Sequence, residues 1–334
     1  MRFVTIGFAH AHIDAAVSGF RQLPGVELVG IADSDAQRLA DRQAKLGVPA
    51  YADYRAMLDA LRPDFAAVCP ANADKAAVIV ECAARGVHVF ADKPLVTRRP
   101  HLEQVERAVQ ASGIEVWAYL ELRYYAPLVE IKRRIDAGQI GEVVSVYATG
   151  PHKLSLPSRT PEMLDAERNG GVLVDLGCHD VDLARWFTGR EPLEVTAYLS
   201  KRRFLQLDNF WDTAQALYRF AGEVSVYIEP SWLQPDASAF WGDSRVMVVG
   251  TLGTLEYRTC DQSVTLVTVE RGEEPVTPEP APVSILEDFV ATLRGHGSGT
   301  LTTAETLATM RAIITAHEAA LAGRTLPCAP PHRP

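Results

Sequence analysis

The chain has 334 residues, a length typical of two ordinary domains, with 47% apolar and 22% charged residues. Its formal net charge is −9 and its lysines and arginines form no cluster, so nucleic acid is not expected as a partner. No apolar run approaches the roughly 20 residues that cross a bilayer, so we expect no membrane association. The first residues are typical of a strand that runs into a glycine turn, without the apolar segment of a signal peptide.

The cysteines favour a reducing compartment. They are odd in number, and none has the C-x-x-C spacing of a zinc or redox site: Cys69, Cys82, Cys178, Cys260 and Cys328. We therefore expect neither a disulfide framework nor a metal site. The cytoplasm is the expected location.

Residues 1–120 alternate short apolar strands with amphipathic helices. The strands are expected at residues 3–6, 28–32, 65–68, 88–91 and 116–119. The helices are expected near residues 11–22, 35–46, 54–61, 74–85 and 101–112. Strands this short and apolar, each followed by a helix, predict an α/β domain with a doubly wound parallel sheet covered on both faces.

After residue 120 the pattern changes to strands in which apolar and polar residues alternate. These strands are expected at residues 142–148, 193–200, 213–220, 223–229, 245–249, 254–258 and 264–269. Helices are expected near residues 127–137, 172–187, 283–294 and 303–322. The alternation predicts an α+β domain with a large, mostly antiparallel sheet. The expected domains are thus 1–120 and 121–326, followed by a disordered tail over 327–334.

Gly7 ends the first predicted strand and opens the first predicted helix, where a dinucleotide-binding protein carries G-x-G-x-x-G. Only the first glycine is present, because Ala9 and His12 occupy the other two positions. A structural turn alone would explain so weak a motif. If a dinucleotide binds here, we expect Gly7, Phe8, Ala9, His10 and His12 to contact it.

Asp33 stands at the end of the second predicted strand, 26 residues after Gly7. A carboxylate at that place binds the hydroxyls of an adenosine ribose and repels a 2′-phosphate, which favours NAD over NADP. The alternative is that Asp33 is the N-cap of the next helix, a role that Ser34 or Asp35 could equally fill.

Lys93 follows a buried strand at the carboxyl edge of the predicted sheet, where open α/β folds bind ligands. An ammonium group there can bind a substrate hydroxyl and stabilise a developing alkoxide. Pro94 restricts the backbone that presents this lysine. The alternative is an ordinary solvated surface lysine.

Asp175, His179 and Asp182 lie about one turn apart on one face of the apolar helix predicted near 172–187. A buried carboxylate beside a histidine can move a proton near neutral pH. The alternative is an exposed stripe with a weak attraction between residues four positions apart.

Together these residues resemble the glucose–fructose oxidoreductase / inositol dehydrogenase (Gfo/Idh/MocA) family, from residue 4 to about residue 326. The shared features are Gly7 with Asp33, the turn over 69–72, and the segments 86–94, 123–141 and 170–182. The resemblance implies a Rossmann domain followed by a domain with an open sheet, through which homodimers or homotetramers form. It also implies hydride transfer with a pyridine nucleotide, on a sugar, a polyol or a derivative of one.

On this resemblance, Lys93, Asp175 and His179 occupy catalytic positions, and Asn72 faces the cofactor ribose. Pro70 and Asp92 are also expected beside the cofactor. Asp92 replaces a glutamate that is usual in the family, and Lys75 replaces a common histidine, which we interpret as surface variation. Ala9 and His12 are the departures that bear most on nucleotide binding.

The expected mechanism assigns the hydroxyl proton to His179 and alkoxide stabilisation to Lys93. Asp175 is expected to hold the imidazole or to bind a neighbouring hydroxyl. The long loop over 150–169 is expected to cover the site. Candidate substrate contacts are Arg123, Tyr124, His152 and Trp186, although Arg123 and His152 could be plain loop residues and Trp186 a core residue.

Three other functions are compatible with parts of the pattern. An imine or carbonyl reductase would use the same lysine and histidine in the reverse direction. A non-catalytic sensor or scaffold would bind the dinucleotide without turnover. A metal hydrolase built on His10, His12 and Asp33 is disfavoured, because the histidines lie two apart on a turn and no H-E-x-x-H helix supports them.

Overall fold

The computed structural model describes residues 1–328, which divide into two compact units. The first unit contains residues 1–120, 168–170 and 283–308, and the second contains 121–167, 171–282 and the chain from 309 onward. The boundary after Leu120 is the one that the sequence pattern predicts. Residues 168–170 and 283–308 differ from that prediction, because they pack in the first unit.

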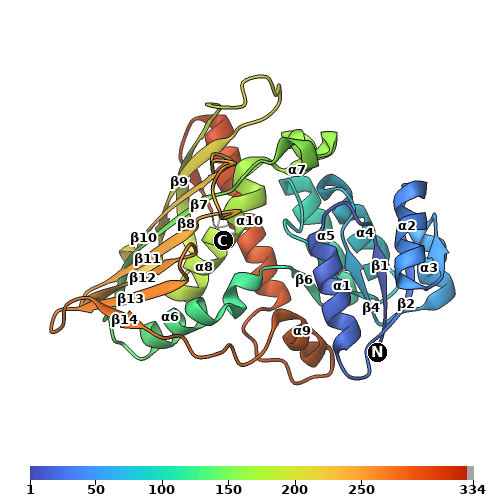
Figure 1. Ribbon diagram of the computed structural model, residues 1–334, viewed down its shortest axis with the longest axis horizontal. Helices are drawn as coiled ribbons and strands as arrows, with labels where there is room; N and C mark the ends of the chain where they lie inside the picture. The colour runs from blue at the N-terminus through green and yellow to red at the C-terminus, as the bar shows by residue number, and fades with distance from the viewer. Residues whose placement is uncertain (329–334) are drawn as a thin grey trace, which may run out of the picture. The chain divides into compact units, whose positions relative to one another are not determined.

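The first unit has a six-stranded sheet in the order β3-β2-β1-β4-β5-β6, and every neighbouring pair is parallel (Figure 1). The strands are β1 (Arg2–Ile6), β2 (Glu27–Ala32), β3 (Ala50–Tyr51), β4 (Phe65–Val68), β5 (His88–Ala91) and β6 (Val116–Ala118). The helices between them are α1 (His12–Gln22), α2 (Ala36–Leu46), α3 (Tyr54–Leu61), η1 (Asn72–Asp74), α4 (Lys75–Ala83) and α5 (Arg99–Ser112). The predicted doubly wound parallel sheet is confirmed.

Helix α9 (Ile285–Leu293) belongs to the first unit because it completes an aromatic core. The ring of Phe289 lies 5.3 to 6.1 Å from the rings of four buried aromatic residues: Phe20, Phe65, Phe90 and Trp117. Ser284 and Glu287 form a capping box that starts the helix. Gly19 of α1 makes room for Leu286, because a Cβ there would lie 2.4 Å from the leucine Cδ1.

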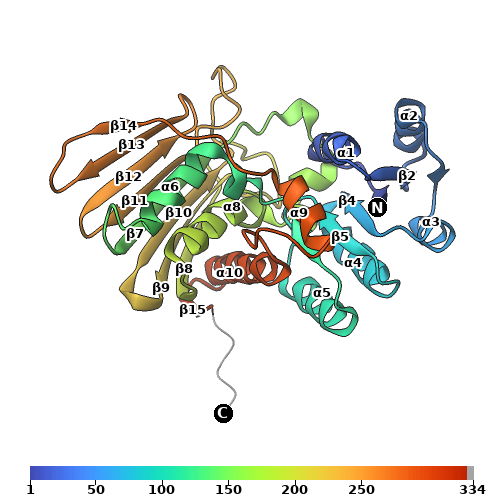
Figure 2. The same ribbon diagram turned by 90° about the horizontal axis from the view of Figure 1, so that it is seen from below.

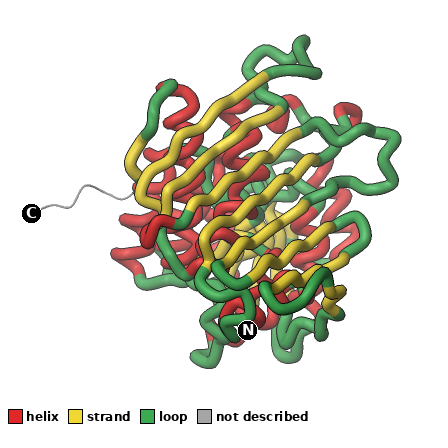
Figure 3. Tube along the Cα trace, turned by 90° about the vertical axis from the view of Figure 1, so that its left-hand side faces the viewer, coloured by secondary structure: helices red, strands yellow, loops and turns green. Residues whose placement is uncertain are grey.

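The second unit has a nine-stranded sheet in the order β14-β13-β12-β11-β7-β10-β9-β8-β15, whose strands are the yellow segments nearest the viewer in Figure 3. The strands are β7 (Val143–Pro151), β8 (Pro192–Ser200), β9 (Thr213–Phe220), β10 (Ser225–Ser231), β11 (Arg245–Gly250), β12 (Gly253–Arg258), β13 (Ser263–Thr268), β14 (Glu274–Val276) and β15 (Leu326–Pro327). All neighbouring pairs are antiparallel except β7 with β10. The predicted mostly antiparallel sheet is confirmed.

Part of the predicted tail has regular structure. Pro327 lies in β15, which pairs with β8, and the backbone N–H of the buried Cys328 donates to the carbonyl of Leu193. These two residues are therefore ordered, contrary to the prediction of disorder over 327–334. The rest of that segment, 329–334, lies outside the described residues.

One face of the nine-stranded sheet is covered by helices. Figure 2 shows α6 (Ala126–Asp136), α8 (Gly171–Thr188) and α10 (Thr303–Ala322) on the same side of the sheet, where α10 belongs to this unit from Thr309 onward. The short helical segments are η2 (Glu121–Tyr124), η3 (Leu156–Ser158), η4 (Pro161–Leu164), α7 (Ala166–Asn169) and η5 (Ala221–Glu223). None of the helices within residues 1–328 is both long and apolar enough to span a membrane.

Candidate active site

The turn after β1 requires a glycine at its first position. Gly7 has a φ of +81°, and a Cβ on it would lie 2.4 Å from the backbone nitrogen of Pro70. The Ala9 N–H donates to the carbonyl of Cys69, so the turns after β1 and β4 are tied together. Helix α1 then begins after Ala11, whose side chain supplies no cap. The first amides of α1 have acceptors within the turn, because the N–H groups of His12, Ile13 and Asp14 donate to His10 Nδ1, the His10 carbonyl and the Ala11 carbonyl.

Asp33 is buried at the end of β2 and holds Arg38 in a bidentate ion pair, with both N–O distances at 2.7 Å. It also accepts hydrogen bonds from the N–H groups of Phe8 and Asp35. Burial alone would raise the pKa of Asp33, but Arg38 and these amides outweigh it and hold the pKa below its ordinary value. The N-cap of α2 is Asp35, so the alternative capping role for Asp33 is wrong.

Lys93 and its neighbours on the turn after β5 are buried, so the alternative of a solvated lysine is also wrong. Lys75, at the start of α4, is 0% exposed, and its ammonium donates to the carbonyls of Asp92 (2.6 Å) and Pro94 (2.9 Å). Our interpretation of Lys75 as surface variation is therefore wrong. This lysine fixes the backbone on both sides of Lys93.

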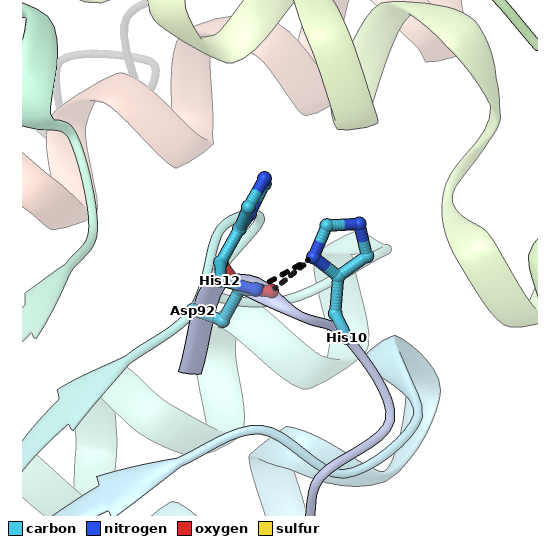
Figure 4. Close-up of side chains that lie close together, drawn as sticks. All are labelled: His10, His12 and Asp92. Carbon is cyan, nitrogen blue, oxygen red and sulfur yellow. Dashed lines mark hydrogen bonds and ion pairs between the residues drawn. The ribbon is translucent and has the colours of Figure 1, made fainter. Parts of the chain in front are cut away.

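His10, His12 and Asp92 form a cluster between the turns after β1 and β5 (Figure 4). The Asp92 carboxylate hydrogen-bonds His12 Nδ1 at 3.1 Å and lies 3.9 Å from His10 Nδ1. Burial alone would raise the pKa of Asp92, but Lys75 and the two histidines hold it well below its usual range.

Within residues 1–328 this cluster is the one set of three side chains with metal-ligand atoms all inside 4.8 Å. The hydrogen bond explains the His12–Asp92 contact without an ion. The absence of a metal site stays a prediction.

Asn72, expected beside the cofactor, lies in η1 with its side-chain amide donating to Asn169 Oδ1 at 2.8 Å and to the Asn169 carbonyl at 3.1 Å. Asn169 belongs to the short segment 168–170 of the same unit. Arg168, next to it, pairs with Asp74. These contacts explain why 168–170 packs with the first unit.

Helix α8 is buried along nearly its whole length, which excludes the alternative of an exposed stripe. Asp175 and Asp182 are buried, and His179 is half-buried. Asp182 forms a bidentate ion pair with Arg123 and accepts a hydrogen bond from Thr309 of α10. The pair joins η2 to α8. Because Asp182 accepts from both Nε and Nη2 of Arg123, this side of the guanidinium is not available to a substrate, the role predicted for Arg123.

A cavity of about 180 Å³ in the second unit contains His179 and His152 among its lining residues. Its other polar lining residues are Glu121, Tyr125, Asp180, Ser244, Tyr257 and Thr259. The predicted substrate contacts Arg123, Tyr124 and Trp186 do not line this cavity. Of the four predicted contacts, His152 alone shares a cavity with His179.

The loop over 150–169 brings a further charge toward Asp175. Arg159 stacks on the ring of Trp232 at 4.8 Å, and its Nε donates to the carbonyl of Leu154. Burial lowers the pKa of Arg159, and the nearby Asp175 charge opposes that shift. That the loop covers the site stays a prediction.

Asp180 is a cavity residue that the sequence reasoning missed. It follows His179 directly and is 6% exposed, and burial raises its pKa to about 7. The available signal was a carboxylate beside the histidine on an apolar helix. Its spacing does not match the stripe of Asp175, His179 and Asp182, so helix periodicity alone does not single it out.

Two family models together match most of the chain. The model of an oxidoreductase family with an NAD-binding Rossmann fold matches residues 1–117, which makes the protein an NAD-binding oxidoreductase. The model of the GFO/IDH/MocA C-terminal domain matches residues 128–256. The chain therefore belongs to the Gfo/Idh/MocA family, as its motifs indicate.

Curated relatives include inositol dehydrogenases. The myo-inositol 2-dehydrogenase of Thermotoga maritima is 26% identical over 275 residues, which are 80% of this chain and 77% of that protein. The scyllo-inositol 2-dehydrogenase (NAD⁺) of Bacillus subtilis is 25% identical over 261 residues, which are 77% and 74% of the two chains. A solved oxidoreductase structure from Thermotoga maritima is 23% identical, with a TM-score of 0.89 over 98% of this chain and 100% of that one. This structure supports the fold.

Replacing Asp180 with asparagine should change how stability depends on pH. The folded-state pKa of about 7 lies above the ordinary 3.8, so the wild-type protein loses stability as pH rises between these values. We expect the free energy of unfolding of Asp180→Asn, relative to wild type, to increase by roughly 2 to 4 kcal/mol from pH 4 to pH 8. Urea unfolding at both pH values measures this change. The exposed Asp208→Asn serves as control, and an equal difference at both pH values for Asp180→Asn would contradict the assignment.

Proposed function

We propose that this oxidoreductase transfers a hydride between NAD(H) and a hydroxyl or carbonyl carbon of a sugar, a polyol or a sugar derivative. The observation that carries the proposal is the cavity lined by His179 and other polar groups in an NAD-binding oxidoreductase, with the buried Asp175 one helical turn before His179 on α8. The inositol dehydrogenases among the relatives support the substrate class.

The residues of the first unit fit a dinucleotide. Gly7 provides a turn where a side chain would collide, and this turn leads to the N-terminus of α1, whose dipole favours the negative charge of a pyrophosphate. The turn residues Phe8, Ala9, His10 and His12 would line that pyrophosphate. Asp33 would bind the adenosine ribose, while Pro70, Asn72 and Asp92 would lie beside the rest of the cofactor. When bound, the nicotinamide supplies the hydride acceptor.

Each catalytic group of this chain has one task in the proposed reaction. His179 takes the proton of the reacting hydroxyl, a role that an imidazole fills well near neutral pH. Lys93 donates a hydrogen bond to the same oxygen and stabilises the alkoxide. Asp175, one turn before His179, orients the imidazole or binds a neighbouring hydroxyl. In the reverse direction the same groups would protonate a carbonyl or an imine.

The two catalytic side chains can be tested separately from cofactor binding. We expect Lys93→Met and His179→Asn to lower kcat by roughly 100-fold or more, because each removes a group that acts on the reacting oxygen. NADH absorbance, in a screen of polyols, aldoses and sugar acids, measures turnover, and thermal shift with NAD measures cofactor binding. The exposed His296→Asn is the control.

Full activity in either catalytic variant would contradict its role. Stabilisation by NAD without turnover of any compound in the screen would instead favour a non-catalytic sensor or scaffold. If neither NAD nor NADP stabilised the protein, the proposed function would fail.

The choice between NAD and NADP depends on the Asp33–Arg38 pair. In the wild-type chain the Asp33 carboxylate would repel a 2′-phosphate, so we expect a lower KM for NAD. Asp33→Ser would release Arg38 to bind that phosphate and should improve NADP use relative to NAD by roughly tenfold or more. Asp33→Ser/Arg38→Ala is the matched control, which should lose the gain. A wild-type preference for NADP would contradict this assignment.

We also propose that a second copy of the chain covers the uncovered face of the nine-stranded sheet, giving a homodimer or homotetramer. Tyr147, Tyr227 and Leu217 stand in register across β7, β10 and β9, and Leu217 is 54% exposed. Tyr198 on β8 adds a side chain that is 64% exposed. Apolar exposure on this scale is typical of an interaction surface.

Charged substitutions on this face should dissociate the oligomer. We expect the double variant Tyr198→Glu/Leu217→Glu to elute as a monomer, because it places buried charges at the interface. Light scattering coupled to gel filtration measures the mass. Leu205→Glu, at a leucine that is 67% exposed in a loop, is the control. A monomeric wild-type protein, or an unchanged mass in the double variant, would contradict the proposal.

A further inference from the structure

Asp180 lines the same cavity as His179, yet the proposed mechanism gives it no role. The two residues are consecutive on α8, so their side chains point about 100° apart around the helix. Both nevertheless belong to the cavity wall, which also includes residues of η2, β7, β11 and β12. A buried carboxyl group at this place requires an explanation in chemical terms.

The lining of the cavity offers Asp180 no permanently charged cation, because it includes no lysine or arginine. Burial is the one cause that raises the pKa of Asp180 to about 7. The titratable groups that face it from the surrounding elements are Glu121, Tyr125, His152, His179, Tyr218 and Tyr257.

The strand opposite Asp180 carries a glycine, which leaves a gap of about a methyl group between its backbone and the carboxyl group. Gly150 of β7 has no side chain, and a Cβ built on it would lie 3.7 Å from Asp180 Oδ2 and 3.7 Å from Ser244 Oγ. The Asp180 carboxyl group and the Ser244 hydroxyl therefore border the same gap in front of Gly150. Thr259 adds a further hydroxyl to the lining of this cavity.

We propose that Asp180 is a substrate-binding residue whose neutral carboxyl group exchanges hydrogen bonds with a hydroxyl of an uncharged polyol or sugar. This inference rests on the proposed function and deepens it. A protonated carboxyl group offers one donor and acceptor sites, as a substrate hydroxyl does. Because the cavity lining around Asp180 holds no lysine or arginine, an anionic group of a substrate bound beside this carboxyl would have no permanent positive charge next to it, which disfavours a carboxylate or phosphate at that end of the substrate.

The first experiment compares two variants of the NAD-loaded enzyme at pH 6. Asp180→Leu removes both hydrogen-bonding functions but suits a buried position, whereas Asp180→Asn keeps a donor and an acceptor. We expect Asp180→Leu to raise KM for the polyol roughly tenfold or more, and Asp180→Asn to change it by less than about threefold. KM for NAD and the thermal midpoint should not worsen in either variant, and Asp208→Asn is the control.

The pH profile provides a readout that a structural role would not move. In the wild-type enzyme, KM for the polyol should rise as pH passes from 6 to 8, because Asp180 ionises. In Asp180→Asn this rise in KM should be smaller. The pH dependence of KM that remains in this variant comes from the other titrating groups of the site. This comparison also decides the matter if Asp180→Leu does not fold.

Several outcomes would overturn the inference. An unchanged KM in Asp180→Leu, or identical pH profiles in wild type and Asp180→Asn, would do so while leaving the proposed dehydrogenase activity intact. A wild-type preference for an aldonate or a sugar phosphate over the parent polyol would have the same effect. If the NAD-loaded wild type neither oxidised a polyol nor bound one by saturation-transfer NMR, both the inference and the proposed function would fail.

Discussion

Helix α8 carries three carboxylates through the interior of the second unit, and the site depends on how each is accommodated. Moving an uncompensated carboxylate out of water costs several kcal/mol. Asp182 is compensated by the bidentate Arg123 pair and by Thr309, which fixes η2 and α10 against the helix. Asp180 has no such partner in its cavity and is accommodated by a raised pKa. Asp175 lies near the charge of Arg159, from the loop that follows β7.

The first unit also buries carboxylates, at the carboxyl edge of its sheet, and compensates their charge. Asp33 is buried against Arg38 and two backbone amides, and Asp92 is buried beside Lys75 and two histidines. Arg38 comes from the helix that directly follows the turn of Asp33, whereas Lys75 comes from the helix that follows the neighbouring strand β4. The edge where parallel strands present ligands is therefore held by ion pairs as well as by backbone hydrogen bonds.

Local patterns predicted most of the architecture and the stripe of Asp175, His179 and Asp182 on α8, because period and spacing are properties of short segments. They did not predict which unit α9 joins, since Phe289 is placed by rings more than 170 residues away in sequence. They also misjudged Lys75, whose acceptors are the carbonyls of residues 92 and 94. Asp180 was missed for a related reason. Its importance comes from a cavity that is also lined by five other elements (η2, α6, β7, β11 and β12), and no spacing along α8 reveals that cavity.

Two positions of the glycine fingerprint, Gly7 and His12, also have a physical explanation in the structure. The first glycine is kept because Pro70 leaves no room for a side chain at Gly7. At the position of the third fingerprint glycine, His12 forms a hydrogen bond with the Asp92 carboxylate. The backbone carbonyl of Asp92 accepts a hydrogen bond from the ammonium of Lys75. The turn expected to hold the pyrophosphate is thereby linked, through one carboxylate, to the turn that presents Lys93. A substitution in either turn should therefore alter the conformation of the other turn, because the Asp92 side chain bonds His12 while its backbone carbonyl accepts from Lys75. In this chain, the histidine that weakens the sequence motif strengthens the connection between cofactor turn and catalytic lysine.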